Sequence, residues 1–374
     1  MIDVKDFFNT LRDQGINNFC GVPDSLLKNI CAYIVDNTEP SQHLITANEG
    51  SAVALAVGHY ISTGKLSLVY MQNSGFGNAI NPLLSLADSR VYGIPMLILV
   101  GWRGEPGVID EPQHIKQGAV MEQLLEACGI NTVIIDSETK NINNVLKESI
   151  ELTKATNQPL VILARKDTFG PYILKKTIPD IAPSSRESAI EKILDSCSET
   201  SDIFVSTTGM ASREMFEIRV KKNQTHKNDF LTVGSMGHAN MIALGIAKNT
   251  NKTVFCIDGD GASIMHLGNL TSIGLSGAKN LIHIIINNAS HDSVGGQPTA
   301  AHMIDLPEIG KSCGYTSSES ISKTEGIAEY IHKLKLQPGP HLLEIKVKKG
   351  SRKDLGRPTS TPNQNKEALM TSFK

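Results

Sequence analysis

The residues best suited to hold a metal ion follow two apolar runs in the second half of the sequence. Asp260 stands between Gly259 and Gly261, and Asn288 closes an Asn-Asn pair. A carboxylate oxygen, an amide oxygen and a nearby backbone carbonyl are hard ligands that suit Mg²⁺, which keeps its other coordination positions for phosphate and water. The two glycines allow the backbone to approach a ligand closely, and a helix that begins here directs free N–H groups at an anion. The pattern therefore predicts a site for a metal ion and a diphosphate.

The apolar runs that must position these residues have the character of buried strands. Segments 253–257 and 281–286 are short, rich in β-branched residues and almost free of charge, which is typical of a parallel sheet. Between them, residues 263–275 carry apolar side chains at nearly helical spacing. We therefore expect a strand, a helix and a second strand in one right-handed crossover. Both polar clusters then lie at the carboxyl ends of parallel strands, where open α/β sheets bind ligands.

The spacing of the two clusters resembles the thiamine diphosphate-binding motif. The Gly-Asp-Gly turn is followed by 25 residues and then by the Asn pair, and no P-loop sequence is present. In that family the Asp, the second Asn and the carbonyl two residues later bind the metal, which implies Asp260, Asn288 and Ser290 in this chain. The resemblance also implies cofactor contacts at Gly261 and Ala262. The expected cofactors are thiamine diphosphate and Mg²⁺.

A thiamine diphosphate enzyme also needs an acid for the other end of the cofactor. The aminopyrimidine acts as a base in its imino form, which a carboxylic acid at the ring nitrogen favours, so this acid must lie in an apolar setting. Glu49 is followed by nine uncharged residues that, apart from Ser51, are small or apolar. This stretch resembles the glutamate-bearing helix of the family's pyrimidine-binding domain. The resemblance assigns Glu49 to activation of the cofactor.

Two further stretches resemble cofactor contacts of the same family. In the sequence GSMG, which begins at Gly234, Met236 takes the place of the apolar residue that bends the cofactor. The carbonyl of Gly234 is then expected to accept a hydrogen bond from the cofactor's amino group. In the sequence TTGMASRE, Thr208 takes a position near the terminal phosphate. The resemblance thus assigns Thr208, Gly234 and Met236 to cofactor binding.

The order of the two halves, pyrimidine-binding before diphosphate-binding, resembles the thiamine diphosphate-dependent 2-oxoacid decarboxylases. A short linker replaces the middle domain of those enzymes in this sequence. The short architecture, the stretches GVPDSLL and HDSVGGQPT and the tail GSRKDLGRPTSTP resemble the phosphonopyruvate decarboxylase family over nearly the whole chain. The resemblance implies decarboxylation of 3-phosphonopyruvate to phosphonoacetaldehyde and CO₂, a step of phosphonate biosynthesis such as the route to 2-aminoethylphosphonate.

The residues expected to contact this 2-oxoacid substrate are polar and follow the predicted strands. Those expected to bind it are Asp24, Ser25, Gln72, Asn73, Ser74, His291 and Asp292. Ser25 and His291 are also expected to act in catalysis beside Glu49, because a histidine titrates near neutral pH and is suited to relaying protons.

The whole chain is expected to form two Rossmann-like α/β domains without a middle domain, each a mainly parallel sheet flanked by helices. The expected divisions are a pyrimidine-binding domain at 1–174, a linker at 175–186, a diphosphate- and Mg²⁺-binding domain at 187–350 and a basic tail at 351–374. The tail is expected to close over the phosphonate as a basic lid through Arg352, Lys353 and Arg357.

Global properties argue against several other classes of protein. The formal net charge of −2 provides no positive field for nucleic acid. The amphipathic start and the lack of any run of eighteen apolar residues argue against a signal peptide and a membrane span. The six cysteines are scattered without a CxxC pair, which favours buried thiols in a reducing compartment, so the expected location is cytoplasmic.

Two alternatives and the assembly stay open at this point. A sulfopyruvate decarboxylase would use the same cofactor on a different anion, and a non-catalytic subunit would bind thiamine diphosphate without turnover. The presence of Glu49 argues against the second alternative. In the resembling enzymes the cofactor lies between the pyrimidine-binding domain of one subunit and the diphosphate-binding domain of another. The resemblance therefore implies a homo-oligomer that is at least a dimer.

Overall fold

The computed structural model of the protein describes residues 1–373 and divides into two compact units. Unit 1 comprises Met1–Thr177 with Val294–Gln297, and unit 2 comprises Ile178–Ser293 with the chain from Pro298 onward. Each unit is built on its own six-stranded sheet, and every pair of neighbouring strands runs parallel. The predicted α/β fold with two parallel sheets is therefore confirmed.

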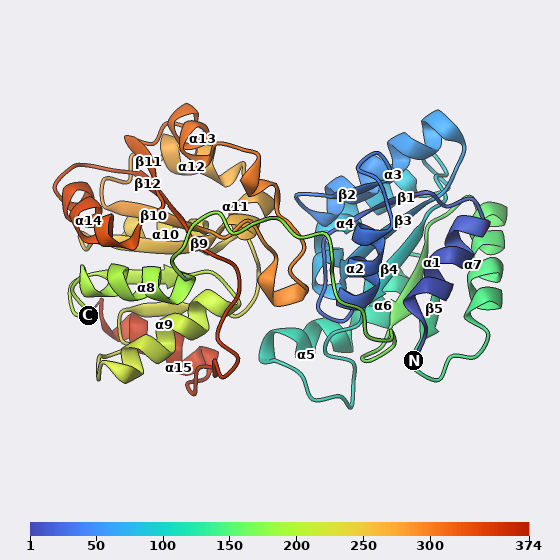
Figure 1. Ribbon diagram of the computed structural model, residues 1–374, viewed down its shortest axis with the longest axis horizontal. Coiled ribbons are helices and arrows are strands. Elements are labelled where there is room, and N and C mark those ends of the chain that lie inside the picture. The colour runs from blue at the N-terminus through green and yellow to red at the C-terminus, as the bar shows by residue number, and fades with distance from the viewer. Residues whose placement is uncertain (374) are drawn as a thin grey trace. The chain divides into compact units, whose positions relative to one another are not determined.

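The sheet of unit 1 has the strand order β2-β1-β3-β4-β6-β5 (Figure 1). Its strands are β1 (Asn18–Gly21), β2 (His43–Ile45), β3 (Ser67–Gln72), β4 (Leu97–Gly101), β5 (Asn131–Ile135) and β6 (Leu160–Ala164). Its helices are α1 (Val4–Asp13), α2 (Lys28–Asp36), α3 (Glu49–Thr63), α4 (Phe76–Pro82), α5 (Pro112–Ala119), α6 (Met121–Ala127) and α7 (Ile142–Thr156), with short helical turns η1 (Asn73–Gly75) and η2 (Leu83–Ala87).

Alternation of side chains along these strands builds one apolar core on each face of the sheet. In β3, Leu68 and Tyr70 join the core to which α1, α2 and α7 contribute, whereas Val69 and Met71 join the core of α3, α4 and α6. Successive residues of a strand point to opposite faces, so a sheet that is covered on both faces needs an almost continuous apolar sequence. This requirement explains why β3 contains no charged residue.

The sheet of unit 2 has the order β11-β12-β10-β9-β7-β8. Its strands are β7 (Ile203–Ser206), β8 (Asp229–Leu231), β9 (Val254–Gly259), β10 (Leu281–Asn287), β11 (Ser317–Ile321) and β12 (His341–Lys346). The helices are α8 (Arg186–Asp195), α9 (Met210–Lys221), α10 (Ala239–Ala247), α11 (Asp260–Met265), α12 (Asn269–Leu275), α13 (Leu306–Ser312), α14 (Ile327–Lys335) and α15 (Pro362–Thr371), and the short turns are η3 (Asp292–Val294), η4 (Ala300–His302) and η5 (Thr324–Gly326). Among residues 1–373, no helix is both long and apolar enough to cross a membrane.

The two sheets share one topology. When the strands are numbered from the first one of each unit, both sheets have the order 2-1-3-4-6-5. The first strand of each unit therefore lies between the second and the third. At that place the connections from the two adjacent strands run to opposite sides of the sheet. Open α/β sheets bind ligands at this switch point, at the carboxyl ends of the strands. In unit 1 this place lies between β1 and β3, and in unit 2 it lies between β7 and β9.

The single helix expected at 263–275 was wrong, because the segment contains two helices. α11 begins already at Asp260, and the chain leaves helical geometry at His266, where φ is −129° and ψ is 52°, before α12 begins at Asn269. The apolar residues keep their helical spacing across the interruption between α11 and α12, so the sequence pattern did not reveal it. The interruption lets the Asn269 side chain donate to the carbonyl of Gly237 at 3.1 Å. It thereby connects α12 to the loop that precedes α10.

The end of the chain differs from the basic tail expected at 351–374. Leu369 of α15 is only 4% exposed and belongs to an apolar core of unit 2. The buried Asn365 accepts a hydrogen bond from Leu231 N–H at 3.0 Å and donates to the carbonyl of Asp229 at 2.8 Å. These bonds occupy backbone groups of β8, which is an edge strand. Helix α15 is thus an integral part of unit 2.

Candidate functional site

Asp260 lies where β9 ends and α11 begins, so both elements fix the position of its carboxylate. The residue is 4% exposed, and the Thr299 hydroxyl donates to its Oδ2. Burial raises the pKa of Asp260 to about 7, although Thr299 and the Gly261 N–H act in the other direction. A divalent cation at this carboxylate would supply positive charge and keep the group ionised. The carboxylate is therefore suited to metal binding.

The Asn pair forms a turn that begins at the last residue of β10. Asn287 accepts a hydrogen bond from Ala289 N–H at 2.9 Å, and Ala289 takes a φ of 56°. Asn287 also donates to Oε1 of the buried Glu344 at 2.7 Å. The amide oxygen of Asn288 accepts from Ser290 N–H at 3.0 Å, and its second lone pair remains for a metal. Asn287 and Glu344 thus hold the turn that presents Asn288.

The loops that carry Asp260 and Asn288 meet at Gly261. A β-carbon at this glycine would lie 3.0 Å from His291 Cε1 and 3.4 Å from the Thr299 methyl carbon, so a larger residue would push the loops apart. Ser290 is 7% exposed, and its hydroxyl has no hydrogen-bond partner among the described residues. A buried carboxylate, an amide oxygen and a polar, incompletely satisfied setting fit the oxygen ligands that Mg²⁺ prefers.

His291 and Asp292, both predicted to contact the substrate, differ in their availability. Asp292 Oδ2 accepts hydrogen bonds from Asn288 Nδ2 at 2.7 Å, Gly350 N–H at 2.9 Å and Arg186 Nη1 at 3.2 Å. This arrangement favours orientation of Asn288 over a contact with substrate. Burial lowers the pKa of His291 to about 4, while Asp292 acts in the other direction. A neutral His291 has one donor and one acceptor nitrogen at its disposal.

The loop that carries Gly234 and Met236 is tied to the end of β7. The Thr208 hydroxyl donates to the carbonyl of Val233 at 2.8 Å. Gly234 and Met236 are both partly exposed, so the carbonyl of the first and the side chain of the second are within reach of a ligand. The structure therefore brings Thr208 together with the loop of Gly234 and Met236 on unit 2.

A buried polar network that no sequence motif marks supports the same region. Asp258 accepts hydrogen bonds from the N–H of the following residue at 2.9 Å and from Ser263 Oγ at 3.0 Å, and its Oδ2 lies 3.3 Å from His283 Nε2. His283 Nδ1 lies 3.0 Å from the Tyr315 hydroxyl. Asp258 and His283 are fully buried. The only signal in the sequence was the presence of these polar residues within apolar strands, and their partners come from other elements.

Glu49 is the first residue of α3 and lies inside unit 1. Asn48 caps the helix, and Glu49 itself is 4% exposed. Asn78 Nδ2 donates to Glu49 Oε2 at 2.8 Å, and a β-carbon at Gly75 would lie 2.1 Å from Oε1. Burial raises the pKa of Glu49, and the Asn78 hydrogen bond only partly opposes that effect. A carboxyl that keeps its proton to higher pH is suited to donating a hydrogen bond to a ring nitrogen.

Four of the predicted substrate contacts form a polar rim at the ends of β1 and β3. Gln72 Nε2 donates to Asp24 Oδ1 at 2.5 Å, and the Ser74 hydroxyl donates to Gln72 Oε1 at 2.6 Å. Ser25 follows Asp24 and its Oγ lies 3.5 Å from Asp24 Oδ1. Asp24 is fully buried, and burial raises its pKa against the effect of the Gln72 hydrogen bond. We call Asp24, Ser25, Gln72 and Ser74 the polar rim.

Arg103 joins the polar rim although no sequence motif marks it. Asn73 fixes its backbone, because Asn73 Nδ2 donates to the Arg103 carbonyl at 2.8 Å and Arg103 N–H donates to Asn73 Oδ1 at 3.1 Å. The guanidinium donates from Nη1 to Ser25 Oγ at 2.7 Å and from Nε to Asp110 Oδ2 at 2.7 Å, and Nη2 donates to Asp110 Oδ1. These bonds favour a role for Asn73 in positioning Arg103. The sequence did not reveal this arrangement, because Ser25 and Asn73 lie 78 and 30 positions away from Arg103 in the chain.

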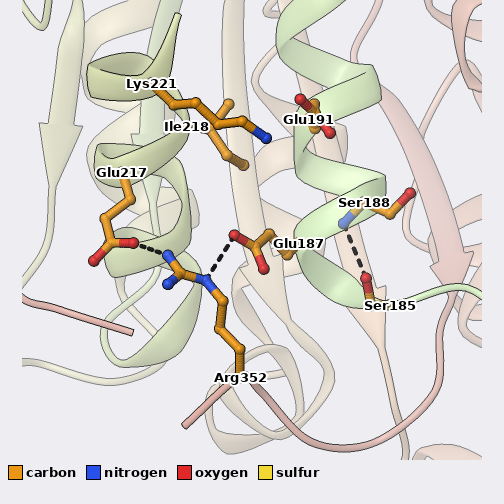
Figure 2. Close-up of a pocket in the computed structure, with 8 residues that line it drawn as sticks. All are labelled: Ser185, Glu187, Ser188, Glu191, Glu217, Ile218, Lys221 and Arg352. Atoms are coloured by element: carbon orange, nitrogen blue, oxygen red, sulfur yellow. Dashed lines mark hydrogen bonds and ion pairs between the residues drawn. The ribbon is translucent and has the colours of Figure 1, made fainter. Parts of the chain in front are cut away.

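A separate pocket of about 530 Å³ in unit 2 contains none of the predicted cofactor residues. It is lined by Ser185, Glu187, Ser188, Glu191, Glu217, Ile218, Lys221 and Arg352 (Figure 2). Arg352 donates to Glu187 Oε1 at 3.0 Å and forms ion pairs with Glu217 and Asp354. Three acidic side chains thus engage the guanidinium, and its charge is not free for the basic lid that was expected of the tail.

Two protein-family models match the chain. The N-terminal TPP binding domain of thiamine pyrophosphate enzymes matches residues 4–125, and the C-terminal TPP binding domain matches residues 207–345. The first match contains Glu49 and the polar rim, and the second contains Asp260 and Asn288. The candidate site residues of each unit therefore lie inside a domain that a family model matches.

Curated relatives align with nearly the whole chain. The phosphonopyruvate decarboxylase of Streptomyces viridochromogenes is 30% identical over 97% of this chain and 92% of its own length, and that of Streptomyces hygroscopicus shows the same identity and coverage. The sulfopyruvate decarboxylase of Methanosarcina acetivorans is 28% identical over 94% of this chain and 91% of its own length. These similarities span both units.

Proposed function

This chain belongs to the family of thiamine pyrophosphate enzymes, and we propose that it decarboxylates 3-phosphonopyruvate to phosphonoacetaldehyde and CO₂. The observation that carries the proposal is the alignment of two phosphonopyruvate decarboxylases with 97% of the chain. The geometry supports it, because such a carboxy-lyase needs an acid that activates the cofactor, a place for a metal and a diphosphate, and polar contacts for an anionic substrate. Residues of each kind lie near the carboxyl ends of the strands.

The cofactor-holding residues divide between the two units. When bound, thiamine diphosphate supplies an electron sink for the electron pair that departing CO₂ leaves behind. The carboxyl O–H of Glu49 in unit 1 would donate a hydrogen bond to the pyrimidine ring nitrogen. On unit 2, the residues that we propose to hold Mg²⁺ and the rest of the cofactor are Asp260, Asn288 and the Ser290 carbonyl for the metal, with Thr208, Gly234, Met236, Gly261 and Ala262 for the cofactor itself.

The chain's own groups would then orient the substrate and move one proton. Ser25, Gln72 and Ser74 offer hydroxyl and amide groups that can orient the 2-oxoacid, and the buried Asp24 holds Gln72 in place. A neutral His291 can hold a proton on one ring nitrogen and receive another on the other. We propose that it takes part in the protonation that follows loss of CO₂. The low pKa of this imidazole is consistent with a neutral group at physiological pH.

The active species is proposed to be at least a dimer that acts in the cytoplasm. The two sets of cofactor residues lie on separate units of the chain, and by resemblance to enzymes whose cofactor lies between subunits we propose that two chains complete each site. The six cysteines are all free thiols, which supports a reducing compartment. Light scattering should give a mass of two chains or more for the active enzyme, and a fully active monomer would contradict this assembly.

The deciding experiment is a substrate panel with the pure protein. We expect Mg²⁺ and thiamine diphosphate together to support release of CO₂ from 3-phosphonopyruvate, with phosphonoacetaldehyde trapped as its hydrazone. Pyruvate should follow with a kcat/KM lower by ~10³-fold or more, because donors meant for the phosphonate stay unpaired. The absence of any CO₂ from the whole panel would favour a non-catalytic subunit over an enzyme.

Sulfopyruvate is the second candidate substrate, since a sulfopyruvate decarboxylase aligns with 94% of the chain. A sulfonate has the three oxygens of a phosphonate but at most one negative charge. The panel therefore includes both anions in direct competition. A higher kcat/KM for sulfopyruvate would keep the cofactor chemistry and replace the proposed substrate.

A further inference from the structure

Arg103 brings a guanidinium to the polar rim of unit 1, and both its backbone and its side chain are held in place. Asn73 holds its backbone through two hydrogen bonds, and Asp110 holds its side chain through two more. The Asp110 carboxylate is itself fixed, because it accepts from Gly104 N–H at 2.8 Å and from Glu111 N–H at 2.7 Å. A long side chain that is held in this way loses little further freedom when it binds a ligand.

We propose that Arg103, presented together with Ser25, binds the phosphonate group of the substrate and selects for it. This inference rests on the proposed function and adds the residue that recognises the anion. Three of the five guanidinium N–H groups donate to Asp110 and Ser25, which leaves two for a ligand. Tetrahedral oxyanions accept hydrogen bonds from such a fork at two oxygens. The Ser25 hydroxyl, which accepts from Nη1, can donate to a third.

The charges around Arg103 determine how it would recognise the anion. Burial opposes ionisation of Asp110, but the Arg103 guanidinium and two backbone N–H groups hold its pKa well below the usual range. Arg103 and Asp110 therefore form a pair without net charge, and the side chains are 19% and 11% exposed. Recognition would rest on directed hydrogen bonds more than on long-range attraction. The affinity is accordingly expected to depend only weakly on ionic strength.

The reaction explains why the guanidinium would bind the phosphonate and leave the carboxylate to neutral groups. The carboxylate loses its charge as it departs as CO₂, so a tight ionic contact would stabilise the ground state more than the transition state. The phosphonate keeps its charge throughout. A contact with it lowers the energy of both states alike and appears in KM. Gln72 and Ser74 of the polar rim offer a neutral amide and a neutral hydroxyl for the carboxylate.

Arg103→Gln tests this assignment in the holoenzyme with two substrates. The KM for 3-phosphonopyruvate should rise by about 10²-fold with kcat nearly unchanged, as expected for loss of a charge-assisted hydrogen bond. The kcat/KM for pyruvate, which lacks the phosphonate, should change less than about threefold by the same argument. Arg103→Lys keeps the charge but loses the fork, and should show an intermediate KM. Arg90→Gln is the matched control, because Arg90 is an exposed arginine of the same unit, paired with Asp88, and should leave both substrates unaffected.

Binding of a non-reacting analogue tests the contact between Arg103 and the phosphonate, here called the anchor, independently of the proposed reaction. Calorimetry should show that 3-phosphonopropanoate binds the wild-type holoenzyme and binds Arg103→Gln far more weakly, whereas propanoate distinguishes the two proteins little. If wild-type protein released no CO₂ from 3-phosphonopyruvate, the proposed function would fail, and this binding difference would still support the anchor. Equal binding of 3-phosphonopropanoate to both proteins, or an equal loss of kcat/KM for both substrates, would overturn the anchor. If Arg103→Gln does not fold, Arg103→Lys is subjected to the same comparison.

Discussion

Units 1 and 2 have the same strand order, yet each places a different kind of buried acid at the start of a helix. Glu49 is the first residue of α3, and Asp260 is the first residue of α11. Both are 4% exposed, and burial raises the pKa of both carboxyl groups. Glu49 follows β2, the second strand of its unit, whereas Asp260 follows β9, the third strand of its unit. The shared topology therefore decides neither where the acid lies nor what its carboxyl group does.

The neighbours of the two acids account for the difference. Burial raises the pKa of Glu49 against the opposing Asn78 hydrogen bond, and Gly75 packs against its Oε1, so this carboxyl is suited to remain protonated and to donate. Asp260 lies on a loop that meets the loop of Asn288 at Gly261, and the Asn288 amide oxygen and the Thr299 hydroxyl are further oxygen atoms of this region. Oxygen ligands close together favour a metal ion over a proton. The same buried acid can thus become a hydrogen-bond donor or a metal ligand according to the loop that faces it.

The largest effect should follow from removing the acid of unit 2. Asp260→Ala removes the charged ligand, so Mg²⁺ and diphosphate should no longer bind together and turnover should fall by ~10³-fold or more. Titration of thiamine diphosphate against fluorescence, at several Mg²⁺ concentrations, measures the loss. Asp354→Ala removes an 81% exposed carboxylate of the same unit and serves as control. Cofactor affinity at the wild-type level in Asp260→Ala would show that the metal assignment is wrong.

Replacing the carboxyl of Glu49 in unit 1 by an amide should separate activation of the cofactor from binding of the cofactor. Glu49→Gln keeps the shape of the side chain but cannot act as a carboxylic acid. Turnover should fall by roughly 10²-fold, within the range for general acid–base groups, while cofactor affinity stays near normal. Hydrogen–deuterium exchange at C2 of bound thiamine diphosphate gives a direct readout. An unchanged exchange rate would rule out activation by Glu49.

The same variant should change the pH dependence of stability in the cofactor-free protein. Burial raises the pKa of Glu49 in the folded chain above its unfolded value, so the contribution of this carboxyl to stability is lost as the pH rises through the folded pKa. Glu49→Gln cannot ionise. Its Tm should therefore exceed that of the wild type at mildly alkaline pH, and the gap should narrow towards acid pH. Calorimetric scans across this pH range measure the difference in Tm between the two proteins. A difference that does not change with pH would contradict a contribution from ionisation of Glu49.

The smallest effect is expected from the tail of unit 2. Arg352 pairs with Glu187 and Glu217 (Figure 2), and it also pairs with the exposed Asp354. Arg352→Ala should leave the KM for 3-phosphonopyruvate within about twofold and change stability little, as is usual for exposed ion pairs. Steady-state kinetics and urea unfolding measure both. A large rise in KM would restore the basic lid that the sequence suggested.

The elements predicted well from sequence are those whose signal is local. β9 and β10 were recognised because strands buried on both faces need continuous apolar sequence, and Asp260 and Asn288 were proposed as metal ligands because they directly follow those strands. β8 and β11 lie at the edges of their sheet and were missed. β8 has only three residues and β11 is mostly polar, so neither shows the pattern of a buried strand.

The amino-acid sequence by itself determined the α/β class, the two polar turns that we propose to bind the cofactor and the acid at the start of α3, because each depends on residues close together in the chain. Only the tertiary structure decided that Arg103 meets Ser25, 78 positions away, and that His283 meets Asp258, 25 positions away. Such contacts depend on which strands are neighbours in the sheet and on the path of each loop. A single arginine or histidine has the same local sequence signal whether it faces solvent or a binding site, so the partner that gives it a role appears only when the chain has folded.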